Sequence, residues 1–142
     1  MKKPEIALKG IRADEMSFRL NNVRPQGERL DLKPVFSRRI RRSVENERLC
    51  FVTITVRIES KADSPKPFDL YVAVTGIFET PLTEDETEKH EAVIACTEVV
   101  FPYLRSAVTN LTTAAMSAPL VLPVMSGPIF PEDRNPGDRV LN

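Results

Sequence analysis

The side chains best suited to catalysis or metal binding are the only histidine, His90, and two cysteines, Cys50 and Cys96. His90 lies between Lys89 and Glu91 in a polar stretch, and neither cysteine stands at a ligand spacing from it. A zinc site needs several nitrogen or sulfur ligands, and a nucleophile needs a neighbouring base. A solvated helical residue explains His90, and reduced core thiols without a CxxC pair explain the cysteines. We therefore expect no catalytic residue, no metal site and no enzyme.

Two other patterns that could bind ligands have simpler explanations. The chain has five glycines and contains neither GxGxxG nor GxxxxGKS, so we expect no nucleotide cofactor. The acidic cluster of Glu84, Asp85, Glu86 and Glu88 lacks the DxDxDG spacing of a calcium loop. Acidic residues in the first turn of a helix favour its positive end, which accounts for the cluster.

The run Arg38-Arg39-Ile40-Arg41-Arg42 is the strongest local charge feature. It suits the binding of phosphates or of an acidic protein surface. It equally suits a solvated edge of a hairpin, where charge discourages aggregation. Glu45 and Glu47 follow closely, and 20 basic residues balance 20 acidic ones. Nucleic-acid binding is therefore kept as an alternative and is not expected.

Composition indicates one globular domain in a reducing compartment. The 142 residues are 42% hydrophobic and 28% charged, which is typical of an ordinary folded domain. The opening residues, Met1 to Glu5, have no apolar stretch before a cleavage site, so we expect no signal peptide. No uninterrupted apolar run approaches the roughly 20 residues that cross a bilayer, so we expect no membrane insertion. Reduced cysteines favour a cytoplasmic location.

Alternating apolar residues predict an antiparallel hairpin in the middle of the chain. From Cys50 to Ile58 the even positions are apolar, and the same alternation runs from Phe68 to Val74. A period of two with many β-branched residues is typical of a half-buried strand. Residues 62–67 contain two prolines and turn-forming side chains, so they should connect the two strands.

Two further strands are expected upstream. Apolar residues from Ile6 to Leu20 predict one long strand, bent near Gly10. Leu30 and Leu32 alternate with charged residues in a fourth strand, which Pro34 weakens or ends because proline lacks a backbone N–H.

A period of three to four residues then predicts a long amphipathic helix ending near Met116. Thr83 and Glu86 have the spacing of a capping box. Pro102 should kink or interrupt the helix. The apolar stripe consists of Val93, Cys96, Val100, Leu104, Ala107, Leu111 and Ala115. One sheet covers only part of such a stripe, so the remainder suggests a partner subunit.

The segment from Ala118 to Pro131 is apolar yet rich in proline. It suits neither a helix nor a central strand. It is either a strap packed over the domain or one wall of a groove that takes up extended apolar peptide. Residues 132–142 are polar and are expected to form a mobile tail.

Several features in order resemble the SecB family of protein-export chaperones. They are Met16-Ser17-Phe18, Leu30-Asp31-Leu32, the hairpin ending in Gly76-Ile77-Phe78, the helical Phe101-Pro102-Tyr103-Leu104-Arg105, and Pro123-Val124. The resemblance covers roughly residues 5–130. It implies an α+β fold with a four-stranded antiparallel sheet packed against a long kinked helix, with residues 1–131 forming the SecB-like domain.

The resemblance also implies a function and its residues. Unfolded or precursor proteins would bind in an apolar groove lined by Leu30, Leu32, Leu120, Leu122, Val124 and Phe130. A homotetramer, built as a dimer of dimers, would use Val100, Leu104, Ala107 and Leu111. SecB proteins dock the motor SecA through acidic positions on the sheet. Here Glu15 keeps one such position, whereas Arg19 and Tyr71 stand where acidic residues are expected.

The resulting hypothesis is an ATP-independent holdase, which binds unfolded or nascent proteins and delivers them to the export machinery. Two alternatives remain open. One is a SecB-like chaperone dedicated to a single partner such as an antitoxin. The other is a nucleic-acid-binding module based on the run from Arg38 to Arg42.

Overall fold

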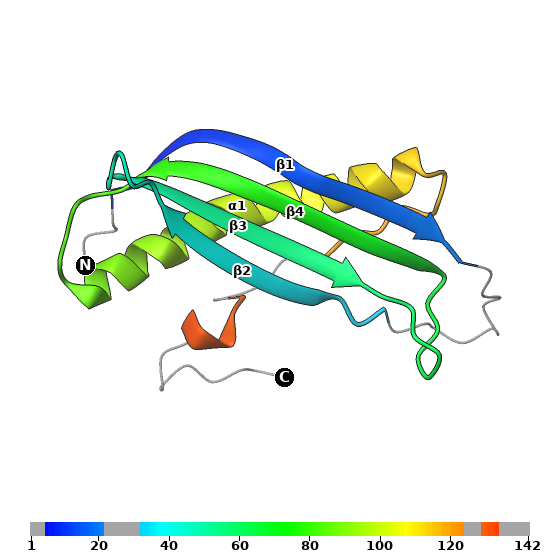
Figure 1. Cartoon of the computed structure of the whole chain (residues 1–142). Helices are drawn as coiled ribbons and strands as arrows, with labels where there is room; N and C mark the ends of the chain where they lie inside the picture. Colours follow the sequence, from blue (N-terminus) through cyan, green and yellow to red (C-terminus); the bar gives the residue numbers. More distant parts are fainter. Residues whose placement is uncertain (1–4, 22–31, 124–128, 134–142) are drawn as a thin grey trace.

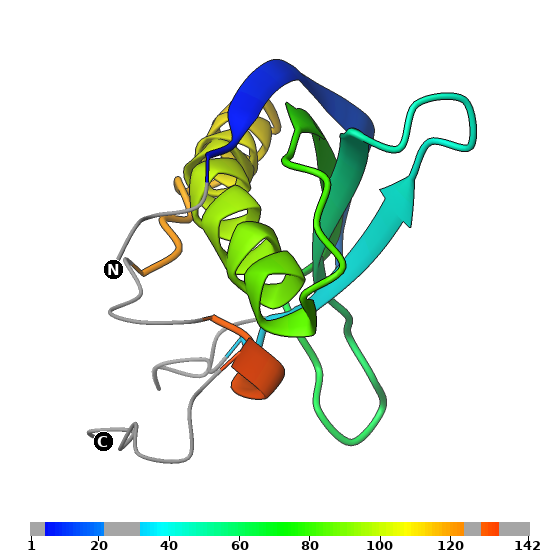
Figure 2. The ribbon, with the colours of Figure 1, turned by 90° about the vertical axis from the view of Figure 1, so that its left-hand side faces the viewer.

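The computed structural model describes residues 5–21, 32–123 and 129–133 of the chain. Its elements are the strands β1 (Ala7–Leu20), β2 (Val35–Arg42), β3 (Leu49–Ile58) and β4 (Phe68–Glu79), the helix α1 (Glu86–Ala114) and the short 3-10 helix η1 (Pro131–Asp133). The strands form one antiparallel sheet in the order β1-β4-β3-β2, and α1 crosses one face of it (Figures 1 and 2). The predicted α+β architecture is thereby confirmed.

The hairpin of β3 and β4 forms the centre of the sheet. Val52 pairs with Gly76 and Ile54 with Val74, and all four residues are buried. The even-numbered residues of both strands face α1, which explains their alternation in the sequence. The predicted antiparallel pairing of these two strands is confirmed.

β1 is the single long strand that the sequence predicts, and it pairs with β4 along its whole length. Its register shifts between Leu8 and Gly10, and again between Ala13 and Glu15. Irregularities of this kind bend a strand locally. The expected irregularity near Gly10 is therefore present, together with a second one that the alternation did not indicate.

The fourth strand lies further along the chain than predicted. β2 begins at Val35, directly after Pro34, whereas Leu32 and Lys33 are not in a strand and Leu30 lies outside the described residues. Lys33 has a φ of 45°, a left-handed conformation that an extended strand does not contain, so no strand runs through this residue. The basic run thus forms most of an edge strand, which matches the simpler explanation of its charge.

The cap of α1 also differs from the prediction. Asp85 is the N-cap, and its carboxylate accepts a hydrogen bond of 2.9 Å from the Thr87 backbone N–H. Thr83 instead accepts a hydrogen bond of 3.2 Å from the Asp85 backbone N–H, in the turn before the helix. Because threonine and aspartate are both good N-caps, spacing alone did not distinguish them.

α1 continues through Pro102, whose ring lies on the exposed face of the helix. The buried residues of α1 are Ala92, Cys96, Thr97, Val100, Phe101, Leu104, Val108 and Thr112. By length and composition alone the helix could cross a membrane, with a mean hydropathy of 1.3 in its most apolar window. Its apolar face packs against the sheet, however, as the core helix of a globular domain does.

Candidate functional site

The segment after α1 folds back along the helix (Figure 1). We call residues 117–123 and 129–133 the strap. Its backbone is held by side chains of α1: Thr109 donates a hydrogen bond of 2.8 Å to the Leu120 carbonyl, and Arg105 Nε one of 3.0 Å to the Leu122 carbonyl. The Leu120 N–H in turn donates to Thr112 Oγ1 at 3.0 Å. An extended, proline-rich chain thus finds partners for its backbone without joining the sheet.

The strap also contributes to the hydrophobic core. Leu122 is 2% exposed and Phe130 is 5% exposed, and both belong to the core cluster. Leu120 and Ile129 are partly buried against the same cluster, whereas Val121 is 64% exposed. In this structure the segment is a packed strap.

Four of the six residues predicted to line the client groove are described, and all four pack in or against the hydrophobic core. Leu32 and Leu120 pack partly buried against the core that includes Leu122 and Phe130. Leu30 and Val124 lie outside the described residues. The four side chains therefore pack against the chain's own core, and their binding of another protein stays a prediction.

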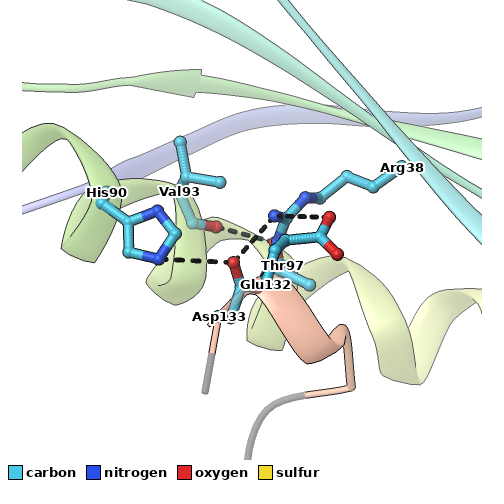
Figure 3. Close-up of polar contacts among 6 residues, drawn as sticks. All are labelled: Arg38, His90, Val93, Thr97, Glu132 and Asp133. Carbon is cyan, nitrogen blue, oxygen red and sulfur yellow. Dashed lines mark hydrogen bonds and ion pairs between the residues drawn. The ribbon is translucent and has the colours of Figure 1, made fainter. Parts of the chain in front are cut away.

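A polar cluster fastens the end of the strap, and Figure 3 shows its members. Arg38 of β2 and Asp133 of η1 form a two-pronged ion pair, in which Nη2 donates to Oδ1 at 2.8 Å and Nη1 donates to Oδ2. The two side chains are only 6% and 1% exposed. His90 Nε2 lies 3.5 Å from Asp133 Oδ1, and Glu132 lies 3.5 Å from Arg38 Nη2. The chain is thus packed as far as Asp133, two residues beyond the predicted end of the domain.

The other three arginines of the basic run differ in their surroundings. Arg42 donates to the Glu47 carbonyl at 3.2 Å and to Thr80 Oγ1 at 3.1 Å, on the helix side of the sheet. Arg39 and Arg41 point to the opposite face, where the Arg41 guanidinium lies 5.3 Å from the centre of the Phe51 ring. The run is therefore divided between two faces and does not form one continuous phosphate-binding patch.

The face of the sheet opposite α1 carries the residue proposed for motor docking. Glu15 is exposed and pairs with Ala73 on this face. Tyr71, two residues away on β4, is covered by the Arg57 guanidinium, 4.5 Å from its ring centre. Arg19 pairs with Asp69 at the end of β1. On this face of the sheet, the acidic side chain of Glu15 therefore lies near aromatic and basic side chains.

A buried hydroxyl pair lies at the centre of the same face. Thr53 and Thr75 Oγ1 atoms are 2.6 Å apart, and Thr75 donates to Asp14. Partial burial alone would raise the pKa of Asp14, but the hydrogen bond from Thr75 and the charge of Arg12 outweigh it, so the pKa is lowered. The group is a hydrogen-bonded network that links β1, β3 and β4.

The thiols behave as core groups. Burial raises the pKa of Cys50, and it raises the pKa of Cys96 to about 12, so both remain protonated and unreactive at neutral pH. Within residues 5–21, 32–123 and 129–133, no group of three or more His, Cys, Asp or Glu side chains is placed to hold a metal ion.

The residues predicted at the subunit interface fall into two groups. Val100 and Leu104 are fully buried between α1 and the chain's own sheet, so their side chains offer no surface to a second subunit. Ala107 and Leu111 are only partly buried. Any contact that α1 makes with another copy must therefore use residues outside the centre of the stripe.

Comparison with known proteins agrees with this fold. The structure is similar to a SecB-like chaperone of Mycobacterium tuberculosis, solved in complex with a peptide from an antitoxin, with a TM-score of 0.65, 18% identity, and coverage of 84% of this chain and 90% of that one. A protein of unknown function from Streptococcus agalactiae aligns with a TM-score of 0.52 and 12% identity, over 85% of this chain and 98% of that one.

Sequence comparison gives the family. The model of preprotein translocase subunit SecB matches residues 1–126. An uncharacterized protein of Methanocaldococcus jannaschii is 30% identical over 125 residues, which cover 84% of this chain and 79% of that protein. The four-stranded antiparallel sheet and the long covering helix are those of a SecB-like fold. The chain belongs to the SecB family.

Proposed function

We propose that this protein is an ATP-independent holdase chaperone, which binds unfolded or nascent polypeptides at the apolar surface that the strap covers. The observation that carries the proposal is the strap itself. It is an extended, proline-broken apolar chain whose Leu122 and Phe130 are buried on the folded domain. The surface beneath it therefore accepts extended apolar polypeptide without a regular strand or helix. Family membership, and a fold neighbour that binds an antitoxin peptide, support the same conclusion.

The proposed mechanism needs no chemical step. A protein that binds the unfolded client and not the native one shifts folding by mass action alone. Apolar contacts contribute about 25 cal/mol for each Å² that is removed from water, whatever the sequence of the client. Several such surfaces in one assembly would raise the effective concentration for a single long client chain.

We expect the protein to slow the aggregation of a reduced, unfolded model client, equally with and without ATP. Light scattering of the client provides the measurement. Leu32→Asp should weaken this protection, because Leu32 is a predicted groove residue that is only partly buried against the core. Leu82→Asp is the matched control, since Leu82 is 54% exposed in the connection before α1. Circular dichroism should show both variants folded. A client that aggregates equally fast with and without the unchanged protein would refute the holdase proposal.

The destination of the client separates two forms of this function. Delivery to SecA requires an acidic docking face, of which Glu15 is the only predicted member present. A chaperone dedicated to one partner, such as an antitoxin, needs no such face. The fold neighbour with its antitoxin peptide favours this second form. In both forms we place the protein in the cytoplasm, where nascent chains and reduced thiols occur together.

We further propose a homotetramer. The outer edges of β1 and β2 have no strand partner among the described residues, and Ala107 and Leu111 of α1 are partly exposed. Unpaired strand edges are surfaces that proteins cover or pair. Light scattering coupled to size-exclusion chromatography should give four times the mass of one chain at micromolar concentration. A stable monomer would contradict this assembly.

A further inference from the structure

The ion pair between Arg38 and Asp133 combines burial with a location at the edge of the proposed client surface. Arg38 projects from the edge strand β2 toward α1, and Asp133 reaches it from η1 (Figure 3). The Phe130 ring, three residues before Asp133, lies 4.7 Å from the Arg38 guanidinium carbon. The strap therefore presents an aromatic ring and a carboxylate, three residues apart, to one cationic site.

The cationic half of this site is built without the strap. Arg38 Nη1 donates a hydrogen bond of 3.1 Å to Thr97 Oγ1 on α1. Thr97 is itself fixed, because its hydroxyl donates to the Val93 carbonyl at 2.7 Å. His90, one helical turn before Val93, adds a ring nitrogen 3.5 Å from the bound carboxylate. The strap supplies the aromatic ring of Phe130, the buried carboxylate of Asp133, and the exposed carboxylate of Glu132, which lies 3.5 Å from Arg38 Nη2.

A buried ion pair contributes little net stability compared with well-packed apolar residues, because both charges lose their hydration. Removing one partner is much more harmful, since it leaves a buried charge without compensation. If the strap leaves its place, the guanidinium of Arg38 needs another carboxylate. Planar, two-pronged recognition of carboxylates is the task for which arginine is best suited.

We propose that Arg38, Thr97 and His90 form a carboxylate-binding subsite of the client surface, which Asp133 occupies in this structure. Its ligand class is an extended peptide in which a bulky aromatic residue is followed, three residues later, by aspartate or glutamate. The strap is the built-in example of such a peptide. This assignment rests on the proposed chaperone function and adds to it a preference for clients that carry this aromatic and acidic pair.

The test uses the full-length chain with its own strap weakened by Phe130→Ala and Asp133→Ala. The probe is a fluorescent peptide with the sequence of residues 127–135, and its anisotropy reports binding. We expect the double variant to bind the peptide at least tenfold more tightly than the unchanged protein does. A peptide with asparagine in place of its aspartate should bind at least tenfold more weakly. Adding Arg38→Gln should remove the difference between the two peptides.

The proposal is overturned if the double variant binds both peptides equally, or if Arg38→Gln retains the preference for aspartate. If the double variant does not fold, Asp133→Asn replaces it, since this change keeps Phe130 and the shape of the strap. The same preference between peptides is then expected, and equal binding again refutes the subsite. Protection of a client without acidic residues tests the holdase function separately, because that client does not need the subsite.

Discussion

Gly76→Ala should lower the free energy of unfolding by about 3 kcal/mol, the upper end of the usual cost of overpacking a core. The Cβ of an alanine at this position would lie 2.6 Å from Phe78 Cε2 and 2.6 Å from Val100 Cγ2. Both residues are completely buried where α1 crosses β4, so neither can move away freely. Gly10→Ala is the matched control, because the nearest atom to its Cβ would be Ile77 Cδ1 at an ordinary 3.7 Å.

Urea denaturation measures this difference as a shift in the midpoint at constant slope. Gly10→Ala should leave the midpoint nearly unchanged. Val100→Ala removes the methyl group that obstructs residue 76, so its effect in the Gly76→Ala background should be smaller than in the unchanged protein. Equal stability of the two glycine variants would mean that α1 does not pack this closely on β4.

The centre of the fold could be predicted because its residues are buried on the faces that local periodicity identifies. The alternation from Cys50 to Ile58 identified β3, since every second side chain faces α1. The same reasoning was less successful for α1. Phe101, Val108 and Thr112 are buried although they lay outside the predicted stripe. The sheet buries a wider strip of the helix surface than the narrow apolar stripe that the sequence indicated.

The edge strand was misplaced because its pattern is not apolar. Five of the eight residues of β2 are polar or basic, as VFSRRIRR shows, and Arg38 takes an inward position that sequence reasoning reserves for an apolar side chain. Its burial depends on Asp133, which is 95 residues away in the chain. Spacing within a motif cannot indicate such a pair, because only the folded chain brings its members together.

The packing of the proline-rich segment after α1 could not be decided from the sequence. Prolines in an apolar segment indicated that Leu120 and Leu122 belong to no regular element. The sequence left two interpretations of this segment open, a strap packed over the domain and one wall of a groove. In the structure the segment is a packed strap. Hydroxyls on α1, such as those of Thr109 and Thr112, form hydrogen bonds with its backbone and hold it in place. Threonine on a helix surface gives no distinctive signal of this role in a sequence.

Leu122→Ala should lower the free energy of unfolding by about 3 kcal/mol, within the range for a buried leucine that leaves a cavity. Val121→Ala, at the exposed neighbouring position, should change it by less than about 0.5 kcal/mol. Denaturant unfolding of both variants provides the comparison. Equal stabilities would show that the strap is not part of the cooperative core.

The same pair of variants links stability to function. If the strap covers the client surface, loosening it with Leu122→Ala should increase the capture of unfolded client at temperatures where the domain stays folded. Val121→Ala should leave capture unchanged. Loss of both stability and capture in Leu122→Ala would instead place Leu122 in the binding surface itself. Because a covering strap and a direct contact predict opposite changes in capture, this one substitution distinguishes the two roles.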